Sequence, residues 1–257
     1  ALFDKASVEA LENFTFTFKM GETTLAEGTK ADLEPYGDAY YGIVLAKIGA
    51  KDFTKSVALS GDLVWEKEFS VKGLAILAET AWAGNEKGVA LAKAMQNFAT
   101  IVADPAATLP HTLTPDMSLV EGFTPSGKIS GDTAFKVSGK GLVMSNAVGI
   151  RIYGTSDVDV TNGYFTIKVN GTDVTDKAVI TAGANAGDYT VDLYVNAKNM
   201  SSELKIELIE KESGKTCLEL VDRVDAIAAS YPATHEKYDL VQQLLVYIQA
   251  AVSYAKA

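Results

Sequence analysis

The sequence has a single cysteine and two histidines, and these small numbers exclude two classes of site. Cys217 has no partner for an internal disulfide, and together with His111 and His235 it is too little for a structural zinc or redox centre. Basic residues are also in the minority, because 23 Lys and Arg face 33 Asp and Glu, for a formal charge of -10. That charge repels phosphate groups, so we expect neither nucleic acid nor an anionic membrane as a partner.

Long hydrophobic runs and catalytic signatures are missing as well. Gln242, Gln243 and Gln249 interrupt the most apolar stretch, so we expect no membrane span. No G-x-S-x-G elbow and no glycine-rich phosphate loop occurs. Residues 157–163 resemble a calcium loop but lack its downstream glutamate, and a turn explains them more simply. We therefore expect no catalytic residue, no metal and no cofactor.

The 257 residues suffice for one large domain or two of ordinary size, and the prolines indicate a boundary. Four of the six prolines lie in one short stretch that is typical of an extended connector: Pro105, Pro110, Pro115 and Pro125. We predict a first lobe over residues 1–104, a connector over 105–116 and a second lobe over 117–257.

The two halves resemble each other at an offset of about 147 to 149 residues. The alternating segment 16–20 aligns with 165–169, and a turn with glycine follows both. The same offset pairs further residues in order: Tyr41 with Tyr189, Val57 with Leu204, Trp82 with Tyr231, Leu91 with Leu240 and Phe98 with Tyr247. An additional strand is expected near residues 149–153, and its counterpart in the first half stays open.

Each half begins with a period of two, typical of half-buried strands, and ends with helical periodicity. Asn162-Gly163 and Asn170-Gly171 are hairpin-turn signals around the strand at 164–169. Apolar stripes predict helices near 71–82 and 91–102 in the first half, and near 220–228 and 240–252 in the second. The predicted fold class is α+β, mainly β, with two tandem antiparallel β-sandwich lobes, each followed by a helical hairpin.

This order of strands and helices, with a turn at 197–200 before a strand and an apolar helix over 240–254, resembles a known repeat. It is similar to the sandwich-plus-helical-hairpin modules of dockerin-associated cell-surface proteins of gut ruminococci and clostridia, including starch-adherence proteins of amylosomes. The resemblance implies a starch-binding function for some members and a structural role for others. It assigns no binding residue to this chain.

Aromatic residues are the most informative functional candidates, since sugar rings stack on aromatic faces while their hydroxyls bond to polar side chains at the rim. Five residues in polar or turn-rich surroundings are candidate glycan-binding residues: Trp82, Trp65, Tyr40, Tyr36 and Tyr231. Each of them has core packing as its alternative explanation.

We interpret the chain as a non-catalytic carbohydrate-binding protein that holds a polysaccharide, most simply starch or another α-1,4-glucan, in an aromatic-lined groove. Because it begins at Ala1 rather than at methionine, we expect a processed or excised segment, and this start neither shows nor excludes export. The resemblance implies a secreted protein associated with the cell surface. Two alternatives remain open. One is a structural or protein-interaction module of a larger cell-surface complex, and the other is a glycoside hydrolase that uses two carboxylates.

Overall fold

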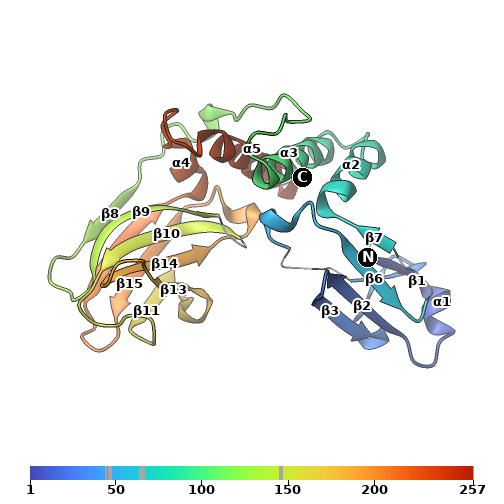
Figure 1. Ribbon diagram of the computed structural model, residues 1–257, viewed down its shortest axis with the longest axis horizontal. Coiled ribbons are helices and arrows are strands. Elements are labelled where there is room, and N and C mark those ends of the chain that lie inside the picture. The colour runs from blue at the N-terminus through green and yellow to red at the C-terminus, as the bar shows by residue number, and fades with distance from the viewer. Residues whose placement is uncertain (44, 46–47, 64–66, 145–146, 257) are drawn as a thin grey trace.

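The computed structural model describes residues 1–43, 45, 48–63, 67–144 and 147–256. It confirms the predicted α+β, mainly β fold class, with four antiparallel sheets (Figure 1). The first half contains β1 (Leu2–Asp4), α1 (Lys5–Glu9), β2 (Thr15–Met20), β3 (Thr23–Thr29), β4 (Glu34–Tyr36), β5 (Tyr40–Gly42), β6 (Val57–Gly61), β7 (Lys67–Phe69), α2 (Val71–Ala81) and α3 (Glu86–Ala103). The second half contains β8 (Ser126–Ile129), β9 (Lys136–Met144), β10 (Val148–Thr155), β11 (Phe165–Val169), β12 (Thr172–Asp173), β13 (Val179–Ala182), β14 (Asp188–Tyr194), β15 (Leu204–Glu210), β16 (Thr216–Asp222), α4 (Val224–Ala229) and α5 (Tyr238–Ala255).

The strand order repeats between the two halves. The sheet β1-β5-β4 of the first half corresponds to β10-β14-β13 of the second, and β3-β2-β6-β7 corresponds to β12-β11-β15-β16. A pair of helices follows the last strand in both halves. The segment 16–20 therefore corresponds to 165–169, and β1 is the counterpart of β10. Strands β8 and β9 have no counterpart among the described residues of the first half.

Each half has an apolar core that both of its sheets help to build. The alternation of apolar and polar residues along each strand turns one side of every sheet inward. In the first half, the core is rich in aromatic rings: Phe3, Phe14, Phe16 and Phe18. In the second half, aliphatic side chains from both sheets predominate: Ile150, Ile152, Ile167, Val191, Ile206 and Leu208.

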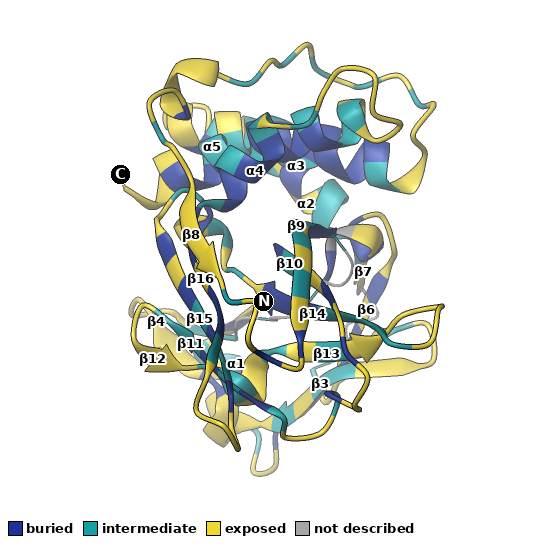
Figure 2. Ribbon diagram, turned by 90° about the vertical axis from the view of Figure 1, so that its left-hand side faces the viewer, coloured by how far each residue is buried: buried dark blue, intermediate teal, exposed yellow. Residues whose placement is uncertain are grey.

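The two helical pairs form one layer beside both β lobes (Figure 1). Helices α3 and α5 pack together, and the Phe98 ring stacks on the Tyr247 ring with 5.5 Å between centroids. Each helix buries one side and leaves the other more exposed (Figure 2). Phe53 and Phe98 of the first half belong to the core of the second half, so that core extends across the connector. Among the described helices, none has the length and apolar character required to cross a bilayer.

Two local predictions are wrong. Leu220 and Val221 belong to β16 rather than to a helix, because both edges of β16 are paired, with β15 and with β8, and α4 starts at Val224. Gly163 has a positive φ, as predicted, with a value of 64°. It follows β10, however, and the partners of β10 are β9 and β14, so Asn162-Gly163 does not close a hairpin. The Asn170-Gly171 turn has φ of 51° and 79° and joins β11 to β12 as predicted.

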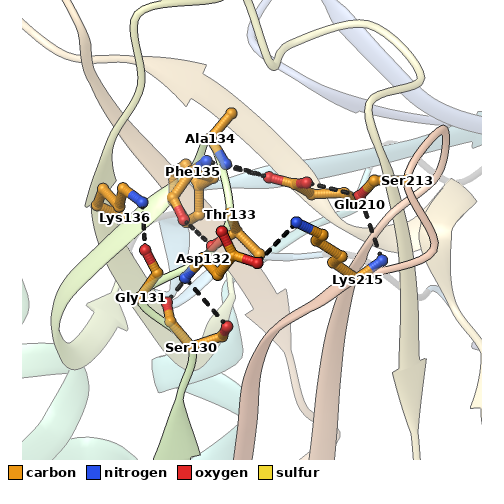
Figure 3. Close-up of polar contacts among 10 residues, drawn as sticks. All are labelled: Ser130, Gly131, Asp132, Thr133, Ala134, Phe135, Lys136, Glu210, Ser213 and Lys215. Carbon is orange, nitrogen blue, oxygen red and sulfur yellow. Dashed lines mark hydrogen bonds and ion pairs between the residues drawn. The ribbon is translucent and has the colours of Figure 1, made fainter.

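The loop between β8 and β9 carries the chain from one sheet of the second lobe to the other, and Glu210 holds it in place (Figure 3). The buried Glu210 carboxylate accepts hydrogen bonds from the Ala134 and Phe135 amides at 2.6 and 3.2 Å. It also accepts hydrogen bonds from the Tyr164 hydroxyl at 3.0 Å and the Ser213 hydroxyl at 2.7 Å. Because protein donors occupy both carboxylate oxygens, this buried acid stabilises the loop.

Amide side chains of α3 and α5 attach the connector to the helical layer. The buried Asn97 of α3 donates to the His111 carbonyl at 2.8 Å and accepts from the His111 amide at 3.1 Å. Its amide also donates to Gln243 of α5 at 3.0 Å. Gln249 makes the same two-way pairing with the backbone of Asp116, at 2.8 and 2.7 Å, closer to the surface. These side chains satisfy backbone amide and carbonyl groups of the irregular connector, as a neighbouring strand would do in a sheet.

We expect the Asn97→Ala variant to be about 2 to 3 kcal/mol less stable than the wild type, because the change leaves buried polar groups without partners. Gln249→Ala is the matched control, since it removes the same pairing at a wetter position and should cost less than about 1 kcal/mol. Urea unfolding at neutral pH measures both values. Equal costs for the two variants would contradict the role of burial in this prediction.

Candidate functional site

The structure brings together two of the predicted glycan-binding residues, Tyr36 and Tyr40. They lie directly opposite each other in the hairpin of β4 and β5, so their side chains share one face of the sheet. That face points away from the core, and the two side chains are 63% and 46% exposed. An aromatic pair of this kind, held by a sheet and open to solvent, offers a flat apolar surface to a ligand.

A hollow of about 570 Å³ adjoins Tyr36 on this face, and we call it the Tyr36 hollow. Its lining includes Leu2, Asp32, Glu34, Tyr36 and Gly42. Gly42 lies opposite Glu34 on one side and Leu2 on the other, in the central strand. A Cβ atom at Gly42 would lie 3.4 Å from the Leu2 Cδ2 and 3.5 Å from the Tyr36 Cβ, so the missing side chain deepens the hollow.

The surroundings of the Tyr36 hollow are polar and acidic. Asp32 caps the short turn after β3, where its carboxylate accepts from the Thr29 amide at 2.7 Å. The Glu34 side chain is exposed, and Asp4 lies beside Tyr40 across the sheet. Hydrogen bonds from the hydroxyl and amide of Ser7 lower the pKa of Asp4. The rim therefore presents carboxylate acceptors for hydroxyl donors at neutral pH.

Trp82 lies elsewhere, in the helical layer. It caps the C-terminus of α2, and its ring stacks on Tyr254 of α5 with 5.8 Å between centroids and 14° between planes. Gly88 of α3 provides room for this ring, because a Cβ there would lie 3.0 Å from the Trp82 Cε3. Trp82 is partly exposed, but its contacts join the ends of two helices. Trp65 falls outside the described residues.

Tyr231 lines a second cavity, of about 410 Å³, which we call the Tyr231 pocket. The pocket lies between α4 and the edge of β9, and its lining includes Lys140, Gly141, Asp222 and His235. The Tyr231 and His235 rings meet edge to face with 4.8 Å between centroids. The Lys237 amide donates to the His235 Nδ1 at 3.1 Å, which fixes the imidazole beside Tyr231.

A buried ion pair forms one wall of the Tyr231 pocket. Asp222 is fully buried, and its carboxylate accepts from the Lys140 ammonium and, at 2.8 Å, from the Arg223 amide. Lys140 belongs to β9 and Asp222 to the end of β16, so the pair links the two sheets of the second lobe. Asp222 is the single carboxylate among the lining residues of this pocket, and its charge is already balanced.

The other candidate reactive side chains are buried or make contacts that stabilise the fold. Burial, with the charge of Glu210 adding to it, raises the pKa of Cys217 to about 11, so its thiol stays protonated at neutral pH. His111 contacts Glu79 and Gln96 at the connector. The Asp159 carboxylate of the calcium-like loop accepts from the Thr161 amide and hydroxyl. Among the described residues, no group of three His, Cys, Asp or Glu side chains is arranged to hold a metal ion.

Sequence reasoning missed Tyr153, which lies near Tyr231. A Cβ atom at Gly141 would lie 3.6 Å from the Tyr153 hydroxyl and 3.9 Å from the Tyr231 hydroxyl, so both tyrosines approach the same glycine. The alternation Ile150, Ile152 against Arg151, Tyr153 was the available signal, because it places Tyr153 on the outward face of a predicted strand.

The chain matches no protein-family model, no curated protein and no solved structure.

Proposed function

We propose that the protein is a non-catalytic carbohydrate-binding module and that the Tyr36 hollow is its glycan site. The exposed pair of Tyr36 and Tyr40 on one sheet face carries this proposal, because it offers a stacking surface with acidic acceptors at its rim. A hollow of about 570 Å³ accommodates a few sugar residues of a longer chain. The resemblance to starch-adherence modules favours an α-1,4-glucan as the ligand.

The exposure of the carboxylates at the hollow supports binding without catalysis. A glycosidase needs a general acid that keeps its proton near neutral pH, and burial in apolar surroundings usually provides it. Asp32 and Glu34 at the hollow are both exposed, and Asp32 is already engaged in a turn. Neither carboxylate has the buried, apolar surroundings that such a general acid usually has.

A specific observation favours the alternative of a protein-interaction module. Helix α2 exposes three large aliphatic side chains, Leu74, Ile76 and Leu77, and the last of them is 67% exposed. Exposed apolar surface of this kind is typical of contacts between proteins. This alternative uses a different element from the glycan site, so the two functions are separable by experiment.

Calorimetric titration of the wild-type protein with maltoheptaose tests the glycan proposal, with cellohexaose and xylohexaose as comparison ligands. We expect saturable binding of maltoheptaose and no increase in reducing ends after prolonged incubation. Binding of none of the three glycans would contradict the proposal and favour the interaction module. Cleavage of a glycan that stops when Glu34 is changed to Gln would favour a hydrolase instead.

A further inference from the structure

We infer that the second lobe carries a second glycan site, on the sheet face that corresponds to the Tyr36 hollow. This inference rests on the proposed function, and it gives the chain two glycan sites. Its basis is the repeated strand order, which makes β10-β14-β13 the counterpart of β1-β5-β4. Equivalent faces of the two halves are open to solvent, and each has a hollow.

The strand registers show which positions correspond. In the first lobe, Leu2 pairs with Gly42 and Asp4 pairs with Tyr40. With Tyr41 aligned on Tyr189, the same two rows in the second lobe are Tyr153 with Thr190 and Thr155 with Asp188. All four of these residues line a hollow of about 290 Å³, which we call the Tyr153 hollow. In the first lobe the row of Leu2 and Gly42 lines the Tyr36 hollow, so the two hollows share this row of the fold.

The chemistry of the Tyr153 hollow suits a neutral sugar. Tyr153 is 39% exposed and supplies an aromatic face where the first lobe has Leu2. Thr155, Asp188 and Thr190 supply hydroxyl and carboxylate groups around it. The aromatic side chains lie on β4 and β5 in the first lobe and on β10 in the second. The two sites therefore share a sheet face and a ligand class, but they are built from different residues.

Arg151 extends the polar rim on the same face of β10. Its guanidinium donates two hydrogen bonds to the Asp192 carboxylate, both at 2.6 Å, and it also interacts with the Tyr153 hydroxyl. The buried Asp192 carboxylate orients the guanidinium, whose side chain stays 32% exposed and can offer donors to sugar hydroxyls. On the other side of Tyr153 lies Gly141, which also lines the Tyr231 pocket, and a Cβ atom there would be within 4 Å of both tyrosine hydroxyls. The predicted residue Tyr231 therefore lies near Tyr153 but lines the neighbouring pocket.

Amide chemical-shift mapping during a titration of the full chain with maltoheptaose tests the inference. We expect two groups of shifts, one around Tyr36, Tyr40 and Gly42 and one around Tyr153 and Thr190. Tyr153→Ala should remove the second group and leave the first unchanged. Tyr153→Phe is the matched control, because it retains the ring and should keep both groups.

The outcomes separate the two proposals. Shifts confined to the first lobe would overturn the second site and leave the proposed function standing. Shifts in neither lobe would overturn both. Two groups that both survive Tyr153→Ala, in a variant with an unchanged melting temperature, would also overturn the assignment of the second site to the Tyr153 hollow.

Discussion

Replacing Tyr36 and Tyr40 together with alanine is expected to weaken maltoheptaose binding by the first lobe at least about thirtyfold. Loss of one stacked aromatic side chain typically costs about 1 to 3 kcal/mol of binding free energy, or roughly fivefold to 150-fold in affinity. Both side chains lie on one exposed face and make no core contact, so the double variant should fold normally. Calorimetry in a background of Tyr153→Ala measures the first lobe alone.

Two further variants make this prediction specific. Tyr36→Phe with Tyr40→Phe keeps both rings, so affinity should fall only a few fold if stacking dominates. Gly42→Val fills the floor of the hollow without touching either tyrosine hydroxyl, and its new Cβ would meet its neighbours at ordinary contact distances of 3.4 Å and more. We expect that variant to lose binding as well. Wild-type affinity in a folded double-alanine variant would remove both tyrosines from the site.

The regular elements of this fold were largely predictable because local patterns and tertiary contacts agree. Residues 165–169 alternate and end in Asn170-Gly171, and they form the strand and hairpin expected of that pattern. The helices near 71–82, 91–102 and 240–252 were also predicted. At residues 220–221 the apolar spacing suits a strand as well as a helix, and pairing with β15 and β8 decided the outcome.

The site was less predictable, because exposure depends on which face of a sheet meets the other sheet. Tyr36 and Tyr40 are only four residues apart, so a hairpin was enough to bring them together. Tyr153 and Tyr231 are far apart in the sequence, and they approach one another only because α4 packs near β9 at Gly141. The position of Trp82 at a helix end is visible in the sequence, but its stacking partner Tyr254 lies in the last helix and gives no local signal.

We expect Glu210→Ala to lower the free energy of unfolding by about 2 to 4 kcal/mol, because it leaves the Phe135 amide and the Tyr164 hydroxyl without an acceptor. Glu210→Gln should cost less, about 1 to 2 kcal/mol. Its carbonyl oxygen can keep three of the hydrogen bonds, and the Ser213 hydroxyl can rotate to accept from the new amide. Asp132→Asn is the control, since its ion pair with Lys215 lies in solvent and should contribute under about 1 kcal/mol.

The pH dependence of this cost provides a second test. Burial by itself raises the pKa of Glu210, but the hydrogen bonds from Ser213, Phe135, Tyr164 and Ala134 outweigh it, and the pKa is lowered overall. The unfolded chain therefore takes up a proton at a higher pH than the folded protein does, so the contribution of Glu210 is complete above the unfolded pKa of about 4.3 and decreases as pH falls through the folded pKa. In urea unfolding between pH 7 and 3, the gap between wild type and Glu210→Gln should stay constant down to about pH 5 and then narrow. A gap that widens on acidification would mean that Glu210 is protonated in the folded protein. That result would contradict the interpretation that a hydrogen-bonded carboxylate holds the β8–β9 loop.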